Sequence, residues 1–128
     1  MLTADCVVVR HRAEVLLVKR GNDPFKGCWA LPGGFMEMDE TIERCAVREL
    51  QEETCLTVDE RQLRLIGVYS APGRDPRGRT VTAAYRVDVE EREAIAGDDA
   101  AEVRWWPLDE LPPLAFDHAE IIAAAMAL

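Results

Sequence analysis

The chain has 128 residues, of which 48% are hydrophobic and 30% charged, and its formal net charge is −9. This length predicts one domain, residues 1–128, and this composition excludes a disordered chain. No run approaches the roughly 20 apolar residues that span a membrane, and the acidic balance argues against nucleic acid as a partner.

The first third of the chain predicts strands and turns. Two β-branched runs, residues 5–10 and 14–20, flank a short polar turn and are typical of a hairpin. Residues 21–27 carry Asn, Asp, Pro and Gly, which predicts a loop, and residues 29–31 predict a short strand. The Pro-Gly-Gly sequence at 32–34 stops that strand, and we expect a tight turn whose backbone can approach a ligand closely.

Two helices and three further strands follow. Residues 40–54 contain neither Gly nor Pro and are periodic, so they predict a helix. Asp117 and Glu120 have capping-box spacing, which predicts a closing helix through the last residue. Strands are expected at 64–70, 80–89 and 103–107. Strands interleaved with two helices predict an α/β or α+β sandwich around a mixed sheet.

The cysteines and the N-terminal residues bear on the cellular compartment. The 4 cysteines show neither CxxC pairing nor a zinc spacing, and the N-terminal residues have no uninterrupted apolar run of the signal-peptide type. We therefore expect a cytoplasmic protein with reduced thiols. Any metal in such a protein would be bound mainly by oxygen.

The helix at 40–54 places carboxylates where apolar side chains are expected. At about 100° per residue, Glu49 and Glu53 fall inside the apolar arc that contains Leu50, and Glu52 lies at its edge. A glutamate-rich helix is more often a solvated face, and that interpretation suits Glu43. Two carboxylates one turn apart in a half-buried cleft repel by roughly 3 kcal/mol at an effective dielectric of 20. A hard divalent cation such as Mg²⁺ or Mn²⁺ would offset this repulsion.

The same segment resembles the Nudix box, GX5EX7REUXEEXGU, in which U is a bulky aliphatic residue. Eight of the nine fixed positions match across 23 residues, which makes chance a poor explanation. The matching residues are Gly34, Glu40, Arg48, Glu49, Leu50, Glu52, Glu53 and Leu56. The departure is Cys55, where the family has a glycine after the helix. We expect Cys55 to adopt a left-handed backbone at some cost in stability.

Flanking segments resemble the ADP-ribose pyrophosphatase branch of that family, among them residues 29–34, 74–79 and 106–112 and the proline at 72. The resemblance implies an α/β/α sandwich that hydrolyses a nucleoside diphosphate linked to another group. ADP-ribose would give AMP and ribose 5-phosphate. The alternatives are hydrolysis of another dinucleotide, a nucleotide sugar or a nucleoside triphosphate, or a sensor that binds ADP-ribose-type ligands without catalysis. A homodimer is compatible with the family but no feature of the sequence demands it.

The resemblance also assigns roles to residues. It implies that Glu49 and Glu53 are Mg²⁺ ligands, with Mn²⁺ able to replace Mg²⁺, and that Glu52 and the Gly33 carbonyl complete the shell. Arg48 and Glu40 match a pair that braces the loop against the helix. The catalytic base is left open between box glutamates, Glu49 or Glu52, and an acid on a distant loop, Asp99, whose ordinary interpretation is an exposed turn.

Basic and aromatic side chains are the candidates for substrate binding. Arg74, Arg77 and Arg79 lie in one loop with a single acid, so the loop has a local charge of +2. A solvated loop and a clamp for phosphate or ribose are equally good interpretations. Further candidates are Arg20 for phosphate, and Trp29 and Phe116 for stacking on adenine, although such aromatics are more often core. His118 is expected at the surface.

Overall fold

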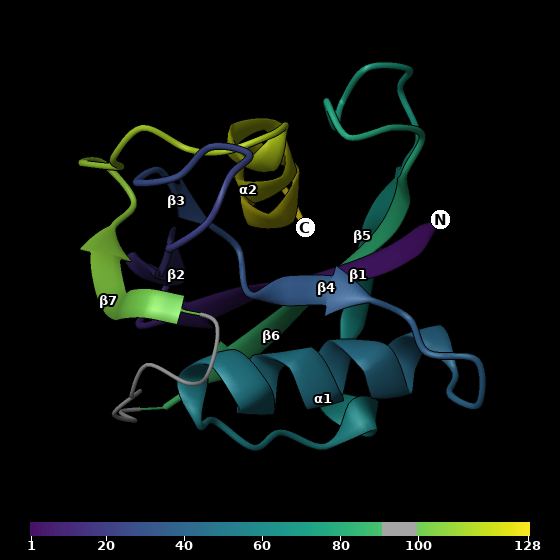
Figure 1. Ribbon diagram of the computed structural model, residues 1–128. Coiled ribbons are helices and arrows are strands. Elements are labelled where there is room, and N and C mark those ends of the chain that lie inside the picture. Colours follow the sequence, from purple (N-terminus) through teal and green to yellow (C-terminus); the bar gives the residue numbers. More distant parts are fainter. Residues whose placement is uncertain (91–99) are drawn as a thin grey trace.

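The computed structural model describes residues 1–90 and 100–128 (Figure 1). Every strand and helix expected from the sequence forms, the strand at 14–20 with the expected ends and the others with shifted ends, and two short elements, β4 (Gly33–Phe35) and η1 (Glu60–Gln62), are added. In chain order the elements are β1 Leu2–Arg10, β2 Glu14–Arg20, β3 Trp29–Ala30, β4 Gly33–Phe35, α1 Ile42–Thr54, the short 3₁₀ helix η1 Glu60–Gln62, β5 Arg64–Tyr69, β6 Val81–Val89, β7 Ala100–Pro107 and α2 His118–Met126.

The strands of the described residues form one seven-stranded mixed sheet, in which five strands follow the order β3-β2-β1-β6-β5, while β4 pairs with β1 and β7 pairs with β2. The expected hairpin joins β1 to β2, and Val9 lies opposite Val15. β1 and β6 run parallel from the Leu2–Val81 pair to the Arg10–Val89 pair, whereas the other pairs are antiparallel. The sheet is therefore mixed, as expected, and β1 lies at its centre.

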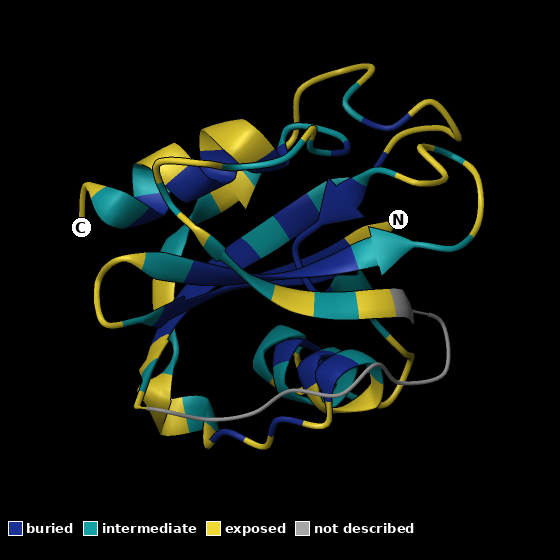
Figure 2. Ribbon diagram, turned by 90° about the vertical axis from the view of Figure 1, so that its left-hand side faces the viewer, coloured by how far each residue is buried: buried dark blue, intermediate teal, exposed yellow. Residues whose placement is uncertain are grey.

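The two helices cover opposite faces of the sheet (Figures 1 and 2). Alternate residues of β1 pack into two separate clusters, because successive side chains of a strand point to opposite faces. Cys6 and Val8 pack with the α1 residue Leu50, whereas Val7 packs with Ile121 of α2. This arrangement confirms the predicted α/β/α sandwich. It also explains why β1 is apolar along most of its length.

Helix α1 begins and ends by local rules. The Thr41 side chain accepts a hydrogen bond from the Arg44 amide, so the helix begins two residues later than expected. At the other end Cys55 has φ 62° and ψ 10°, and its amide donates to the Gln51 carbonyl. The predicted left-handed backbone at Cys55 is confirmed.

Two local predictions are wrong. The Pro-Gly-Gly segment is not a tight turn, because Gly33–Phe35 form strand β4, which pairs antiparallel with β1. Asp117 precedes α2 but makes no side-chain cap hydrogen bond, because its carboxylate instead accepts two hydrogen bonds from the Arg74 guanidinium group, from Nε at 2.9 Å and from Nη2 at 2.7 Å. Both errors arise from contacts between residues far apart in the sequence.

A buried arginine anchors the last helix to the sheet. Arg86 of β6 is 1% exposed, and its Nη1 donates to the Ala125 carbonyl near the end of α2. Cations at a helix C-terminus are favourable because the helix dipole is negative there. In the described part of the chain, no helix is both long and apolar enough to cross a bilayer.

We predict that Cys55→Gly raises the unfolding free energy by about 1 kcal/mol, since glycine adopts the left-handed backbone without the steric cost that a Cβ imposes. The thermal midpoint should rise by about 4 °C. Cys55→Ala is the matched control, because it removes the thiol but keeps the Cβ, and it should give no such gain. Equal midpoints for the glycine and alanine variants would contradict the explanation.

Candidate active site

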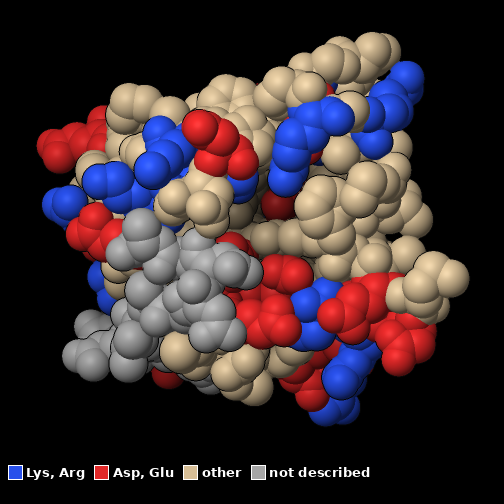
Figure 3. Space-filling model, viewed as in Figure 1, with Lys and Arg blue, Asp and Glu red and all other residues tan. Residues whose placement is uncertain are grey.

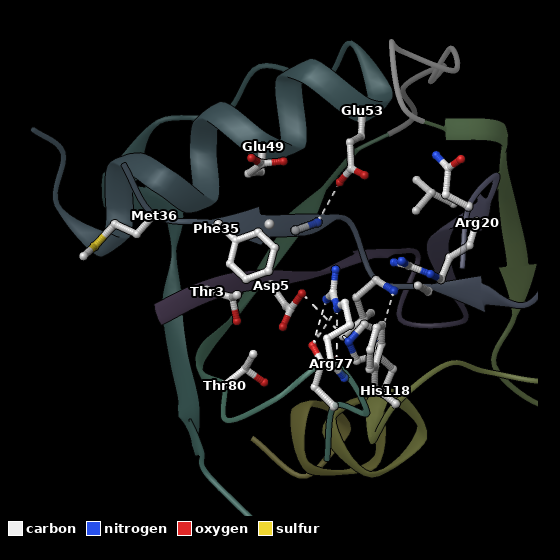
Figure 4. A pocket seen from close by; sticks show the side chains of 18 of the residues that line it. Thr3, Asp5, Arg20, Phe35, Met36, Glu49, Glu53, Arg77, Thr80 and His118 are labelled. Carbon is white, nitrogen blue, oxygen red and sulfur yellow. Dashed lines mark hydrogen bonds and ion pairs between the residues drawn. The ribbon is translucent and has the colours of Figure 1, made fainter. Parts of the chain in front are cut away.

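A pocket of about 450 Å³ opens between α1 and the strands β1 and β4. The loops at 20–22 and 74–80 and the segment around Phe116 complete its wall. In Figure 3 acidic side chains gather over α1 below a hollow, and basic side chains lie across the hollow from them. The close-up in Figure 4 shows the same division inside the pocket.

Two of the predicted helix carboxylates line this pocket. Glu53 lines it from the last turn of α1, and its Oε1 accepts a hydrogen bond of 2.8 Å from the Gly33 amide of β4. Glu49 lines it one turn earlier, with a side chain that is 17% exposed, and its Oε1 accepts from Arg48 Nη1 at 2.9 Å. The helical periodicity therefore located both side chains on the inner face.

The third carboxylate lies elsewhere. The Glu52 side chain is 46% exposed and does not contribute to the pocket lining. Its Oε2 accepts a hydrogen bond of 3.0 Å from Arg48 Nη1, the same nitrogen that binds Glu49. Within the described residues, the structure thus brings together Glu49 and Glu53 but not Glu52 in the pocket.

Arg48 connects helix and loop as the resemblance implied. Its Nε and Nη2 donate to the two carboxylate oxygens of Glu40 at 2.9 and 2.6 Å, and Nη2 also donates to the Phe35 carbonyl. The hydrogen bond from Arg48 is the main reason that the pKa of Glu40 falls from 4.5 to about 2. This bidentate pair holds the β4–α1 loop against the helix that carries Glu49.

Two arginines face the helix carboxylates from the opposite wall. The Arg77 guanidinium binds Asp75 at 2.8 Å and lies 5.2 Å from the centre of the Phe35 ring and 5.8 Å from that of Phe116. Arg20 lies 5.1 Å from the Phe116 ring centre. Burial lowers the pKa of Arg20, and the neighbouring Arg77 lowers it further. An anionic ligand between the walls would relieve this repulsion between the two cations.

Three further predicted contacts lie in three different environments. Arg74 lines the pocket, but its side chain is only 5% exposed. Its guanidinium group is paired with Asp117 and forms part of the pocket wall. Arg79 does not line the pocket and donates to the Ser70 carbonyl. Trp29 is 7% exposed and packs edge-on against Trp106 in the core, with ring centres 5.1 Å apart. Asp99 lies outside the described residues.

Two polar residues on the pocket floor were not expected there from the sequence. His118 was expected at the surface, and this is wrong, because the residue is 4% exposed and its Nδ1 accepts a hydrogen bond from the Leu31 amide. Asp5 is 7% exposed and lies in the apolar strand β1. A single carboxylate within a run of buried apolar residues was the available signal for Asp5.

Comparisons with known proteins place the chain in a family. The profile of the NUDIX domain matches residues 1–125. The chain belongs to the Nudix family. It is 50% identical over 115 residues to an ADP-ribose pyrophosphatase of Methanocaldococcus jannaschii, and the match covers 90% of this chain and 67% of that relative.

Solved Nudix structures agree with the fold. The NUDIX domain of Shewanella oneidensis NrtR, solved with ADP ribose, is 35% identical with a TM-score of 0.90, over 99% of this chain and 86% of that one. A bifunctional NMN adenylyltransferase/ADP ribose pyrophosphatase from Francisella tularensis, solved with AMP and a Mn ion, is 34% identical with a TM-score of 0.88. That match covers 98% of this chain but only 41% of the bifunctional protein.

The donor set of this Nudix domain fits Mg²⁺ or Mn²⁺ held jointly by protein and ligand. Within the described residues no three His, Cys, Asp or Glu side chains form a ready-made metal cage. Mg²⁺ is usually bound by one or two carboxylates together with waters and substrate phosphates. The carboxylates of Glu49 and Glu53 on one wall meet that requirement.

We predict that Gly34→Ala weakens Mn²⁺ binding by about tenfold, which is the usual cost of disturbing the orientation of a carboxylate that would hold a metal ion. A Cβ on Gly34 would lie 2.5 to 2.7 Å from the carboxylate atoms of Glu49, so that side chain must move. Calorimetry with Mn²⁺ measures the change. Gly33→Ala is the contrasting variant, since its Cβ would clash with the Ala4 carbonyl of β1. We expect Gly33→Ala to lower the thermal midpoint and Gly34→Ala to leave it nearly unchanged; equal midpoints for the two would contradict this interpretation.

We also predict an acid-dependent contribution of Glu40 to stability. The folded state lowers the pKa of Glu40 from 4.5 to about 2, so the folded protein favours its ionised form. The stabilisation is complete above about pH 5 and is lost as the pH falls toward about 2. Urea unfolding of wild type and Glu40→Gln should therefore differ by a constant amount near neutral pH and converge in acid. Glu37→Gln is the control, because Glu37 lies 3.8 Å from Arg48 and is 61% exposed.

Proposed function

We propose that residues 1–128 form a single Nudix domain that hydrolyses ADP-ribose to AMP and ribose 5-phosphate with the help of Mg²⁺. The observation that carries this proposal is the pair Glu49 and Glu53 on one wall of the pocket, opposite the cations of Arg20 and Arg77. The 50% identity to the ADP-ribose pyrophosphatase of M. jannaschii favours ADP-ribose among diphosphate substrates. Mn²⁺ is expected to replace Mg²⁺.

The two walls of the pocket would bind different parts of a diphosphate complex, the metal ion on one side and the phosphate oxygens on the other. Glu49 and Glu53 would hold the metal ion, and Gly33 donates its amide to Glu53, which fixes that carboxylate. Arg20 and Arg77 are placed to bind phosphate oxygens on the other side, with Arg77 oriented by Asp75. Phe116 is placed to pack against the base or sugar. A diphosphate linkage, which carries two negative charges, could thus bind in a protein whose own net charge is −9.

Hydrolysis requires that water attack a phosphorus atom while the bridging P–O bond breaks. The bound metal would neutralise charge on the phosphate oxygens and make water a stronger nucleophile. Glu49 is oriented for this chemistry by the shared Arg48 guanidinium. We assign Glu52 a supporting role, because it binds the same Arg48 nitrogen from outside the pocket. The alternative candidate for the general base, on a distant loop, is Asp99.

The competing proposal is a domain that binds ADP-ribose without cleaving it. S. oneidensis NrtR, whose NUDIX domain was solved with ADP ribose, was also solved with a 27mer DNA, and this chain matches 59% of that DNA-bound protein. The presence of both inward carboxylates favours the hydrolase. Binding of ADP-ribose with no product in the presence of Mg²⁺ or Mn²⁺ would favour the sensor.

We predict that Glu49→Gln and Glu53→Gln each lower kcat for ADP-ribose by at least about 100-fold, because each removes charge from the metal site. Chromatography of products from ADP-ribose, other dinucleotides, nucleotide sugars and nucleoside triphosphates measures both activity and selectivity. Glu43→Gln is the matched control on the same helix, since Glu43 does not line the pocket. The metal assignment fails if both pocket variants keep wild-type kcat, and the substrate assignment fails if another compound is cleaved faster.

A further inference from the structure

Two polar side chains on the pocket floor are not used by the proposed hydrolysis. Asp5 comes from β1 and His118 from the start of α2, and both line the pocket although each is less than a tenth exposed. Their facing atoms, Asp5 Oδ1 and His118 Nε2, are 3.9 Å apart, which is too far for a direct hydrogen bond. In Figure 4 both side chains lie across the pocket from Glu49 and Glu53 of α1, and a dashed line joins Asp5 to His118.

The protonation of His118 follows from its contacts. Nδ1 accepts a hydrogen bond of 3.0 Å from the Leu31 amide, so the proton of the neutral ring is on Nε2. Burial lowers the pKa of His118, which favours this neutral form. Nε2 donates to no atom of residues 1–90 or 100–128, and Trp106 Nε1 is the one fully enclosed side-chain nitrogen or oxygen in this part of the chain without a partner. The Nε2–H of His118 is therefore accessible from the pocket.

Asp5 offers the complementary group in a fixed orientation. Its Oδ2 accepts a hydrogen bond of 2.6 Å from the Thr82 hydroxyl of the neighbouring strand. That bond turns Oδ1 toward His118. A Cβ on Gly33 would clash with Asp5 Oδ1, so the glycine of β4 leaves this oxygen room. The floor thus presents one donor and one acceptor side by side.

We propose that Asp5 and His118 bind one sugar hydroxyl of the ligand, which donates to Asp5 Oδ1 and accepts from His118 Nε2. A hydroxyl oxygen at about 2.8 Å from both atoms fits a separation of 3.9 Å. An ionised phosphate oxygen cannot donate and would be repelled by the carboxylate, and an apolar group would leave both atoms unpaired. The inference rests on the proposed ADP-ribose substrate and adds a residue pair that selects for its sugar.

The test measures binding, so that it does not depend on hydrolysis. The ligands are α,β-methylene ADP-ribose, which has a carbon in place of the bridging oxygen, its 2′-deoxy and 3′-deoxy forms on the adenosine side, and α,β-methylene ADP, which lacks the distal ribose. Calorimetry with Mn²⁺ gives Kd for each. We expect wild type to lose about tenfold or more in affinity when one particular hydroxyl is missing. The ligand that shows the loss identifies which ribose lies on the floor.

The variants Asp5→Asn and His118→Asn then connect that hydroxyl to the pair. Asparagine at 118 can still accept from the Leu31 amide but lacks a donor at the position of Nε2, and asparagine at 5 can still accept from Thr82. In each variant the ratio of affinities between the complete and the deoxy ligand should fall to about one. Asp75→Asn is the matched control, because this pocket carboxylate binds Arg77 and should weaken all ligands equally.

Several outcomes would overturn the inference. One is a wild type that binds both deoxy ligands and α,β-methylene ADP as well as the complete ligand, which would mean that water occupies the floor; this measurement needs no variant to fold. Another is an unchanged ratio in both folded variants. A third is a His118 Nε2–H resonance that stays in place when the complete ligand binds, because the proposal requires it to move downfield with that ligand and not with the deoxy form. A wild type that discriminates between the complete and the deoxy ligand but forms no products from ADP-ribose itself would refute the hydrolase alone.

Discussion

Carboxylates on the inner side of a helix must be matched by positive charge or by hydrogen-bond donors, and this requirement organises the pocket. The single side chain of Arg48 binds Glu49 in the pocket as well as Glu40 and Glu52 outside it, and the Gly33 amide donates to Glu53. The protein thereby holds acidic side chains close together before any ligand arrives. The cost of leaving a buried charge without a partner is several times the gain from a single surface ion pair, so the arrangement is expected to be rigid.

The glycines of β4 satisfy a second constraint, because neighbouring groups approach the backbone of this strand closely on both sides. Gly33 lies against the β1 backbone and Asp5, whereas Gly34 lies against the Glu49 carboxylate. A side chain at either position would separate the sheet from helix α1 or displace the carboxylate. The short strand thus sets the distance between the sheet, which supplies the floor, and the helix, which supplies the acidic wall.

Local patterns in the sequence were sufficient to predict most of the secondary structure and part of the pocket. Alternation and periodicity predicted the strands and helix α1, and the wheel placed Glu49 and Glu53 on the inner face. The Nudix box located the left-handed residue Cys55, which the structure confirms. Contacts over long sequence separations could not be read in the same way. Asp117 follows a capping pattern, but Arg74, 43 residues away, binds its carboxylate. His118 is buried beside the Leu31 amide, 87 residues away, which donates a hydrogen bond to it.

The floor and the walls of the pocket differ in how they are supported. Asp5 belongs to β1, which pairs with three other strands and has a core cluster on each face. Amides in such a central strand exchange with solvent only when the whole domain opens. Arg20 and Arg77 instead lie at the end of a strand and in a loop. Evolution could therefore alter the phosphate side of the pocket by changing loops, whereas a change at Asp5 would have to be compatible with the folding of the entire sheet.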